Sequence, residues 1–169
     1  VLMGKETADS GYYKWGKTIT PTYLPVDNDE YFVGCDLSLV DWLSRYSYDH
    51  YEEFVRGWLA RMLFSGEESQ KKASVISGGE KVRCMLAKMM LEGGNFMILD
   101  EPTNHLDLES ITALNDGLVA FKGCLLMTSH DRELMNTVCN RIIEIDGGKK
   151  VYDRPVDYDT YLEETMNKQ

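Results

Sequence analysis

Three short segments of this chain carry side chains suited to binding and transferring phosphate. The first is a glycine-rich helix start at Ser77–Glu80, the second an apolar run that ends in Asp100 and Glu101, and the third an apolar run that leads to His130. In α/β sheets, ligand chemistry gathers at the carboxyl ends of the strands. The order of these segments therefore predicts a phosphate-binding site at such an edge.

Ser77 and Glu80 stand three residues apart, which is the spacing of a helix capping box. Such a cap contributes on the order of 1 kcal/mol. It does not explain Gly78 and Gly79, because glycine lowers helix propensity. Glycine at this place lets a phosphate approach the N–H groups at the positive end of the helix dipole. Capping alone explains two of the four residues, and phosphate binding explains the set.

Asp100 and Glu101 directly follow a strand that we predict over Phe96–Leu99. A buried parallel strand explains the apolar run but not two carboxylates at its end. Neighbouring strand residues point to opposite faces unless the chain turns, so the two acids can take different roles. Alternatively, the two acids are only solvated turn residues. The glycine-rich helix start in the same chain argues against this interpretation.

Further polar residues follow the predicted strands. Asp107 is placed to cap the next helix, and Asp131 to cap the helix after His130. His105 is interpreted as a structural or interface residue and His50 as a surface histidine.

In this order the segments resemble those of the ATP-binding cassette (ABC) ATPases. The sequence Asp-Glu-Pro-Thr-Asn-His-Leu-Asp at 100–107 resembles the ABC-F branch, whose members bind ribosomes rather than membrane domains. The resemblance covers nearly the whole chain and implies ATP and Mg²⁺ as cofactors. It also implies a second nucleotide-binding domain of the same parent chain as partner, with two ATP molecules held between the domains.

The resemblance implies a role for each motif residue. Asp100 would hold Mg²⁺, and Glu101 would polarise the attacking water as general base. His130 would be the switch histidine, which contacts the γ-phosphate and the catalytic carboxylate. Ser77–Glu80 would complete the ATP site of the facing domain, and Asp107 would end the loop that positions both ATP sites.

Two expected features are missing. No G-x-x-x-x-G-K-[ST] phosphate loop occurs in the chain. Because Val1–Gly4 is interpreted as the end of the helix that follows this loop in the family, we expect the chain to be cut from a longer domain. Val26 stands where the family usually has a Gln near Mg²⁺, so either Asp27 or Asn28 substitutes for it or hydrolysis is slow.

The expected fold class is α/β, an ABC-type nucleotide-binding domain fragment with a mainly parallel sheet, a helical subdomain and an antiparallel β-hairpin. We place the hairpin at 12–15 and 18–24, inside a first part of the ATPase core at 1–34. The helical subdomain follows at 35–92, the α/β core at 93–155 and a C-terminal helix at 156–169. Two apolar helix faces are expected in the core: Leu39, Val40 and Leu43, and then Phe54, Trp58, Leu59, Met62 and Leu63.

After residue 95, short apolar strands alternate with helices. The strands are predicted at 96–99, 124–128 and 141–145, with a closing hairpin strand at 149–152. Helical segments are predicted at 111–118, 134–138 and 158–166, the last with Asp157 as its N-cap.

Composition limits the class of protein. The net charge of −10 opposes binding to a phosphate backbone, so any contact with ribosomal RNA is expected through regions outside this chain. No apolar run approaches the ~20 residues that span a bilayer, and no signal peptide opens the chain. We expect a cytoplasmic protein without a membrane partner. The four cysteines form no C-x-x-C pair and are interpreted as reduced core residues.

The leading hypothesis is therefore an ATP-hydrolysing domain of an ABC-F, ribosome-associated translation factor. The ATPase subunit of an ABC transporter is one alternative, which the loop at 103–107 disfavours. The other alternative is a non-catalytic interaction module in which ATP only stabilises a dimer, and Val26 favours it.

Our first prediction is that residues 1–169 alone hydrolyse no ATP and bind it at most weakly. The reason is that a phosphate loop supplies most of the N–H groups and the lysine that hold a nucleotide. Titration calorimetry on the purified chain measures this, and micromolar ATP affinity would contradict it.

Overall fold

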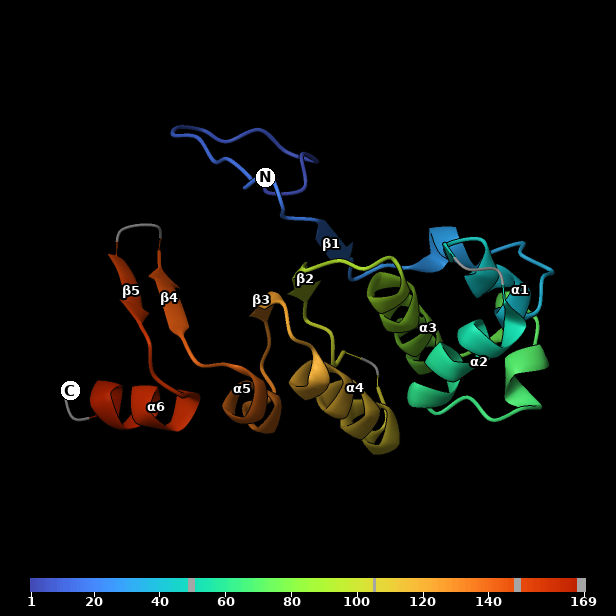
Figure 1. Cartoon of the computed structure of the whole chain (residues 1–169). Helices are drawn as coiled ribbons and strands as arrows, with labels where there is room; N and C mark the ends of the chain where they lie inside the picture. The colour runs from blue at the N-terminus through green and yellow to red at the C-terminus, as the bar shows by residue number, and fades with distance from the viewer. Residues whose placement is uncertain (49–50, 105, 148–149, 167–169) are drawn as a thin grey trace. The chain divides into compact units, whose positions relative to one another are not determined.

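The computed structural model describes residues 1–48, 51–104, 106–147 and 150–166. Contacts between residues divide the chain into two compact units, Val1–Thr128 and Ser129–Gln169, which are described separately (Figure 1). The finer division predicted from the sequence, at residues 34, 92 and 155, stays a prediction.

The first unit contains a parallel sheet in the order β1-β2-β3, formed by Pro21–Leu24, Phe96–Asp100 and Cys124–Thr128 (Figure 1). The central strand β2 is paired on both sides, and its residues Met97 and Leu99 are buried. The α/β fold class with a mainly parallel sheet is therefore confirmed.

The predicted hairpin at 12–24 is wrong. The strand begins only at Pro21 and pairs in parallel with β2, and residues 11–20 form no strand. Asn95 explains this, because its side chain accepts a hydrogen bond from Thr20 N (2.8 Å) and donates one to Thr18 O (2.7 Å). Trp15 packs edge-on against Phe96, with ring centroids 5.0 Å apart. These contacts replace those of a hairpin partner.

The region between β1 and β2 is mainly helical, as predicted. It contains α1 (Leu39–Ser44), α2 (Glu52–Arg61) and α3 (Gly78–Leu91), with short 3₁₀ turns η1, η2 and η3 at Asp29–Tyr31, Glu68–Gln70 and Ala73–Val75. Helix α4 (Leu108–Ala120) follows β2 and packs against α3.

The inner face of α2 differs from the prediction. Its buried residues are Val55, Leu59 and the C-cap Met62, whereas Phe54 is 46% exposed and Trp58 only half-buried. The helical period explains this, because residues 55, 59 and 62 share one face and residue 54 lies about 100° round the helix from residue 55.

The second unit contains α5 (Arg132–Val138), an antiparallel hairpin of β4 (Ile142–Asp146) and β5 (Lys150–Arg154), and α6 (Tyr158–Met166). Tyr152 donates a hydrogen bond to Glu164 (2.7 Å), which ties β5 to α6. Asp157 accepts a hydrogen bond from Thr160 N (2.7 Å) and is the N-cap of α6, as predicted.

The prediction of four core cysteines is right only for Cys84, whose burial raises the pKa of its thiol well above the usual range. Cys124 is exposed, and Cys35 and Cys139 are half-buried. Cys124 lies on β3, an edge strand whose residues are at most half-buried, so its apolar sequence pattern does not make it a core residue.

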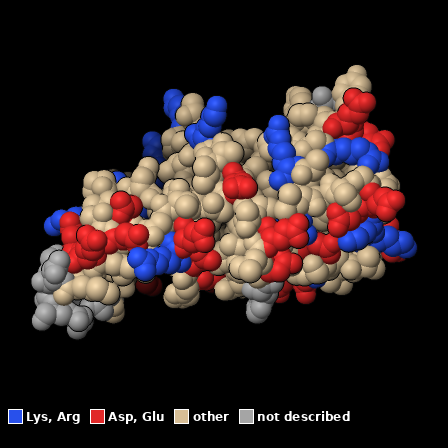
Figure 2. Space-filling view, turned by 90° about the horizontal axis from the view of Figure 1, so that it is seen from below, with Lys and Arg blue, Asp and Glu red and all other residues tan. Residues whose placement is uncertain are grey.

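Acidic and basic side chains are interspersed on the face drawn in Figure 2, without a continuous basic patch there. Within the described ranges, no helix is long and apolar enough to cross a bilayer.

Met97→Ala tests whether β2 is the centre of the core. The fully buried Met97 side chain leaves a cavity when shortened, so we expect a loss of about 2–5 kcal/mol in the free energy of unfolding. Urea unfolding measures the loss. Val119→Ala is the control, because Val119 is 58% exposed and its change should stay within about 0.5 kcal/mol. Equal effects would mean that β2 is not packed as described.

Candidate functional site

Helix α3 begins with a complete capping box. Ser77 Oγ accepts a hydrogen bond from Glu80 N (3.3 Å), and Glu80 Oε2 accepts one from Ser77 N (2.8 Å). The remaining N–H groups of the first turn have no partner inside the helix. The sequence-predicted cap is confirmed, and its role towards a nucleotide stays a prediction.

The two glycines of this turn have different surroundings. A Cβ at Gly79 would lie 3.2 Å from Ser110 Oγ and 3.5 Å from Leu106 Cδ2, so Gly79 lets α3 pack closely on the start of α4. A Cβ at Gly78 would meet no atom within 4 Å, and Gly78 is exposed. Packing therefore explains Gly79, while the open space at Gly78 leaves the helix start accessible to a ligand.

Charged partners surround the first turn of α3. Lys71 Nζ donates to Glu80 Oε1 (2.8 Å), and Lys81 forms an ion pair with Asp29 of η1, in the connection after β1. Burial raises the pKa of Glu80, but the hydrogen bonds from Lys71 and Ser77 outweigh it and hold this pKa below its usual value. Glu80 is thus a charged structural anchor of the helix start.

The carboxyl ends of β2 and β3 meet at Asp100 and Thr128. Thr128 Oγ1 donates a 2.7 Å hydrogen bond to Asp100 Oδ1, in register with the pairing of the two strands. The sequence analysis did not identify Thr128. A polar residue at the end of an apolar strand was the signal available for it.

Glu101 has a left-handed backbone, with φ 46°, which is strained for a residue other than glycine. Its N–H lies 3.1 Å from both Thr128 O and Thr128 Oγ1, which offsets the ~1–2 kcal/mol of strain. The turn sends Glu101 away from the course of β2, and its Oε2 atom is buried. The two adjacent acids therefore occupy different environments, as a division of roles requires.

Asp107 is the N-cap of α4, where its Oδ1 accepts a hydrogen bond from Ser110 N (2.8 Å). Hydrogen bonding by the Ser110 side chain, and then by the Ser110 backbone N–H, lowers the pKa of the exposed Asp107 carboxyl. Since Ser110 also contacts Gly79, the loop end at Asp107 and the start of α3 are brought together. The structure thus joins two of the predicted segments.

His130 lies exposed in the second unit, between Ser129 and the α5 N-cap Asp131. Asp131 accepts a hydrogen bond from Leu134 N (2.8 Å), so the predicted cap is confirmed. The association of His130 with Glu101 stays a prediction. His105 and His50 lie outside the described residues.

The surroundings of Asp27 and Asn28, in the loop after β1, indicate which of them could substitute for the missing Gln. Val26 is 62% exposed, and Asp27 Oδ1 accepts a hydrogen bond from Asp29 N (2.9 Å) within the loop itself. Asn28 is 94% buried, and its Oδ1 atom makes no hydrogen bond. Of the two candidates, Asn28 is therefore the one whose side-chain oxygen is free to accept a further hydrogen bond.

The end of β2 suits Mg²⁺ by the type of its ligand atoms. Mg²⁺ prefers oxygen and is usually held by one or two carboxylates together with substrate phosphates. Asp100 presents a carboxylate oriented by Thr128. Within the described ranges no cluster of three or more His, Cys, Asp or Glu could hold a metal ion.

The chain has relatives among known proteins. Residues 5–104 match the protein family described as ABC transporter. The chain is 60% identical over 164 residues to an uncharacterized ABC transporter ATP-binding protein, YkpA, of Bacillus subtilis, covering 96% of this chain and 30% of that protein. It is 36% identical over 152 residues to the energy-dependent translational throttle protein EttA of Mycobacterium tuberculosis, covering 86% and 26%.

The fold is also similar to that of a solved structure named RNase-L Inhibitor. The TM-score is 0.75 at 21% identity, and the match covers 99% of this chain and 33% of the other. The chain therefore spans about a third or less of the length of YkpA, EttA and the RNase-L Inhibitor structure.

The pKa of Glu80 generates a pH prediction. Because folding lowers this pKa, the carboxylate stabilises the protein fully above the ordinary glutamate pKa of about 4.5, and the contribution is lost as the pH falls through the lowered value. Glu80→Gln should therefore make stability less dependent on pH in the acid range. Urea unfolding at a series of pH values measures this. A pH dependence of Glu80→Gln equal to that of the unchanged protein would contradict the assignment.

Proposed function

This chain belongs to the ABC transporter family, and we propose that it is most of one ATP-hydrolysing domain of a ribosome-associated translation factor. Its relatives include a member of the F branch of that family. The parent protein would bind ATP between two such domains, close, act on the ribosome and reopen after hydrolysis. We place this activity in the cytoplasm.

The geometry of Glu101 is the observation that carries the proposal of hydrolysis. Glu101 has a strained backbone at the carboxyl end of a parallel strand, and two hydrogen bonds from its N–H hold it there. Such strained conformations occur mainly at functional sites. Its carboxylate is assigned as the general base that accepts a proton from the attacking water.

Asp100 is assigned to the cation, with Thr128 keeping its carboxylate in one orientation. When bound, Mg²⁺ would neutralise charge on the phosphate oxygens. By the family resemblance, His130 is assigned to contact the γ-phosphate.

The start of α3 is assigned to the nucleotide of the facing domain. Ser77 and the open backbone at Gly78 offer a hydroxyl and N–H groups to a γ-phosphate at the positive end of the helix dipole. Asp107 is assigned to the loop between the two domains. Ser110 links Asp107 to Gly79, so a movement of this loop on domain closure would also move the start of α3, which serves the other ATP site.

The ribosome is proposed as partner because of the sequence at 100–107 and the similarity to the throttle protein EttA. The charge of −10 requires that the RNA-binding surface belongs mainly to other parts of the parent protein.

Glu101→Gln in the full-length protein tests the proposal. The amide keeps the shape of the side chain but cannot accept the proton, so ATP turnover should fall about 10²–10⁴-fold while ATP still binds. The ATP-bound form should then accumulate and co-sediment with ribosomes. Steady-state hydrolysis and sedimentation with ATP measure the two effects.

Glu109→Gln makes the same chemical change at an exposed position of α4 and should leave turnover unchanged. Unaltered turnover of Glu101→Gln would remove the general base and leave the non-catalytic module as the better hypothesis. Association of the trapped form with membranes instead of ribosomes would identify a transporter subunit.

A further inference from the structure

Helix α2 carries aromatic and cationic side chains on a face that does not enter the core. Phe54, Trp58 and Arg61 recur at helical spacing, while Val55 and Leu59 occupy the buried face. Phe54 meets Trp58 edge-on, with ring centroids 6.5 Å apart, and the Arg61 guanidinium lies 4.5 Å from the Trp58 ring. Trp58 is thus held between two neighbours, so little side-chain entropy is left to lose on binding.

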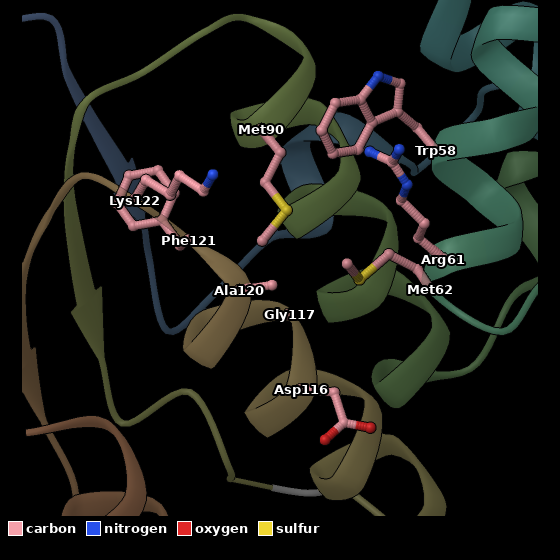
Figure 3. A pocket seen from close by; sticks show the side chains of 9 residues that line it. All are labelled: Trp58, Arg61, Met62, Met90, Asp116, Gly117, Ala120, Phe121 and Lys122. Carbon is pink, nitrogen blue, oxygen red and sulfur yellow. The ribbon is translucent and has the colours of Figure 1, made fainter.

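This face of α2 leads into a pocket of about 520 Å³ between α2, α3 and α4 (Figure 3). Its apolar lining includes Met62, Met90 and Phe121. A Cβ at Gly117 would lie 3.1 Å from Met62 Cε and 3.4 Å from Met90 Cε, so the two methionines meet α4 at its one glycine. Methionine side chains adapt their shape readily, which suits a surface that receives another side chain.

The charges around the pocket are unbalanced. Arg61 and Lys122 lie on opposite sides of it and Asp116 apart from both (Figure 3). Apart from the contact of Arg61 with Trp58, the described residues give these three groups no hydrogen bond or ion pair. Two cations against one anion favour an occupant with carboxylates beside its apolar part.

We propose that the exposed face of α2 and this pocket dock a protein segment that inserts a large apolar side chain between Met62, Met90 and Phe121 and places acidic side chains at Arg61 and Lys122. Tryptophan and arginine are the residues in which binding energy at protein interfaces concentrates. The proposal concerns a surface apart from Asp100 and Glu101 and does not depend on ATP hydrolysis.

A single-stranded RNA is the competing occupant, since bases also stack on tryptophan and arginine. Acidic groups argue against it: Glu53 directly precedes Phe54 on α2, and Asp116 lines the pocket. Phosphates would be repelled there, whereas a mixed acidic and apolar protein segment can avoid these positions.

Selection from a displayed library of random peptides on the full-length protein tests the proposal. Ala120→Trp fills the pocket from α4, and Val119→Trp adds the same side chain one residue away, outside the lining. We expect selected peptides to combine a large apolar residue with Asp or Glu. Their affinity, measured by fluorescence anisotropy, should fall roughly tenfold or more with Ala120→Trp and stay unchanged with Val119→Trp.

The charges are tested on the same peptides. Arg61→Glu should weaken binding roughly tenfold, and Lys14→Glu, the same charge change at an exposed residue outside the pocket, should not. Selection of basic peptides, or of no peptide that distinguishes Ala120→Trp from Val119→Trp, would overturn the proposal. So would binding of poly(U) RNA that Ala120→Trp abolishes.

Discussion

Thr128 and Asp100 join the carboxyl ends of β3 and β2 through their side chains, and the geometry of the proposed catalytic site depends on this contact. The parallel register sets the two residues opposite each other, and the oxygen atoms of Thr128 then receive the N–H of Glu101. Without these acceptors, the left-handed backbone of Glu101 would lose the interactions that offset its strain. The orientation of the Asp100 carboxylate and the backbone conformation of Glu101 thus depend on a pair of strands rather than on one motif.

Helix α3 packs against α1, α2, α4 and β1 in the first unit. Its first turn is anchored by Glu80 and Lys71, and its close packing at Gly79 brings it to Ser110 of α4. Cys84, Met85 and Met89, further along α3, are fully buried. A ligand bound at the start of α3 would therefore contact a helix that is fixed in the core and that also packs against the loop end at Asp107.

Helix α2 has a face that packs in the core and an adjacent face that lies toward solvent, and the helical period alone sets them apart. One face of α2 supplies Val55 and Leu59 to the core, and the next supplies Phe54 and Trp58 to the solvent side. Apolar residues on adjacent faces therefore perform different tasks, and the unmatched cations Arg61 and Lys122 give the outer face a preference for acidic partners.

Local sequence determined the elements whose causes are local. The capping box of α3, the caps at Asp107, Asp131 and Asp157, and the apolar strand leading to Asp100 depend on residues within a few positions of one another. The tertiary structure decided features that depend on distant residues. Asn95, far along the chain, binds the segment that resembled a hairpin strand, and Thr128 orients the carboxylate of Asp100 on another strand. Likewise, the partial burial of Trp58 and the exposure of Cys124 depend on which neighbours pack against each face. The periodicity of one segment carries no information about those neighbours.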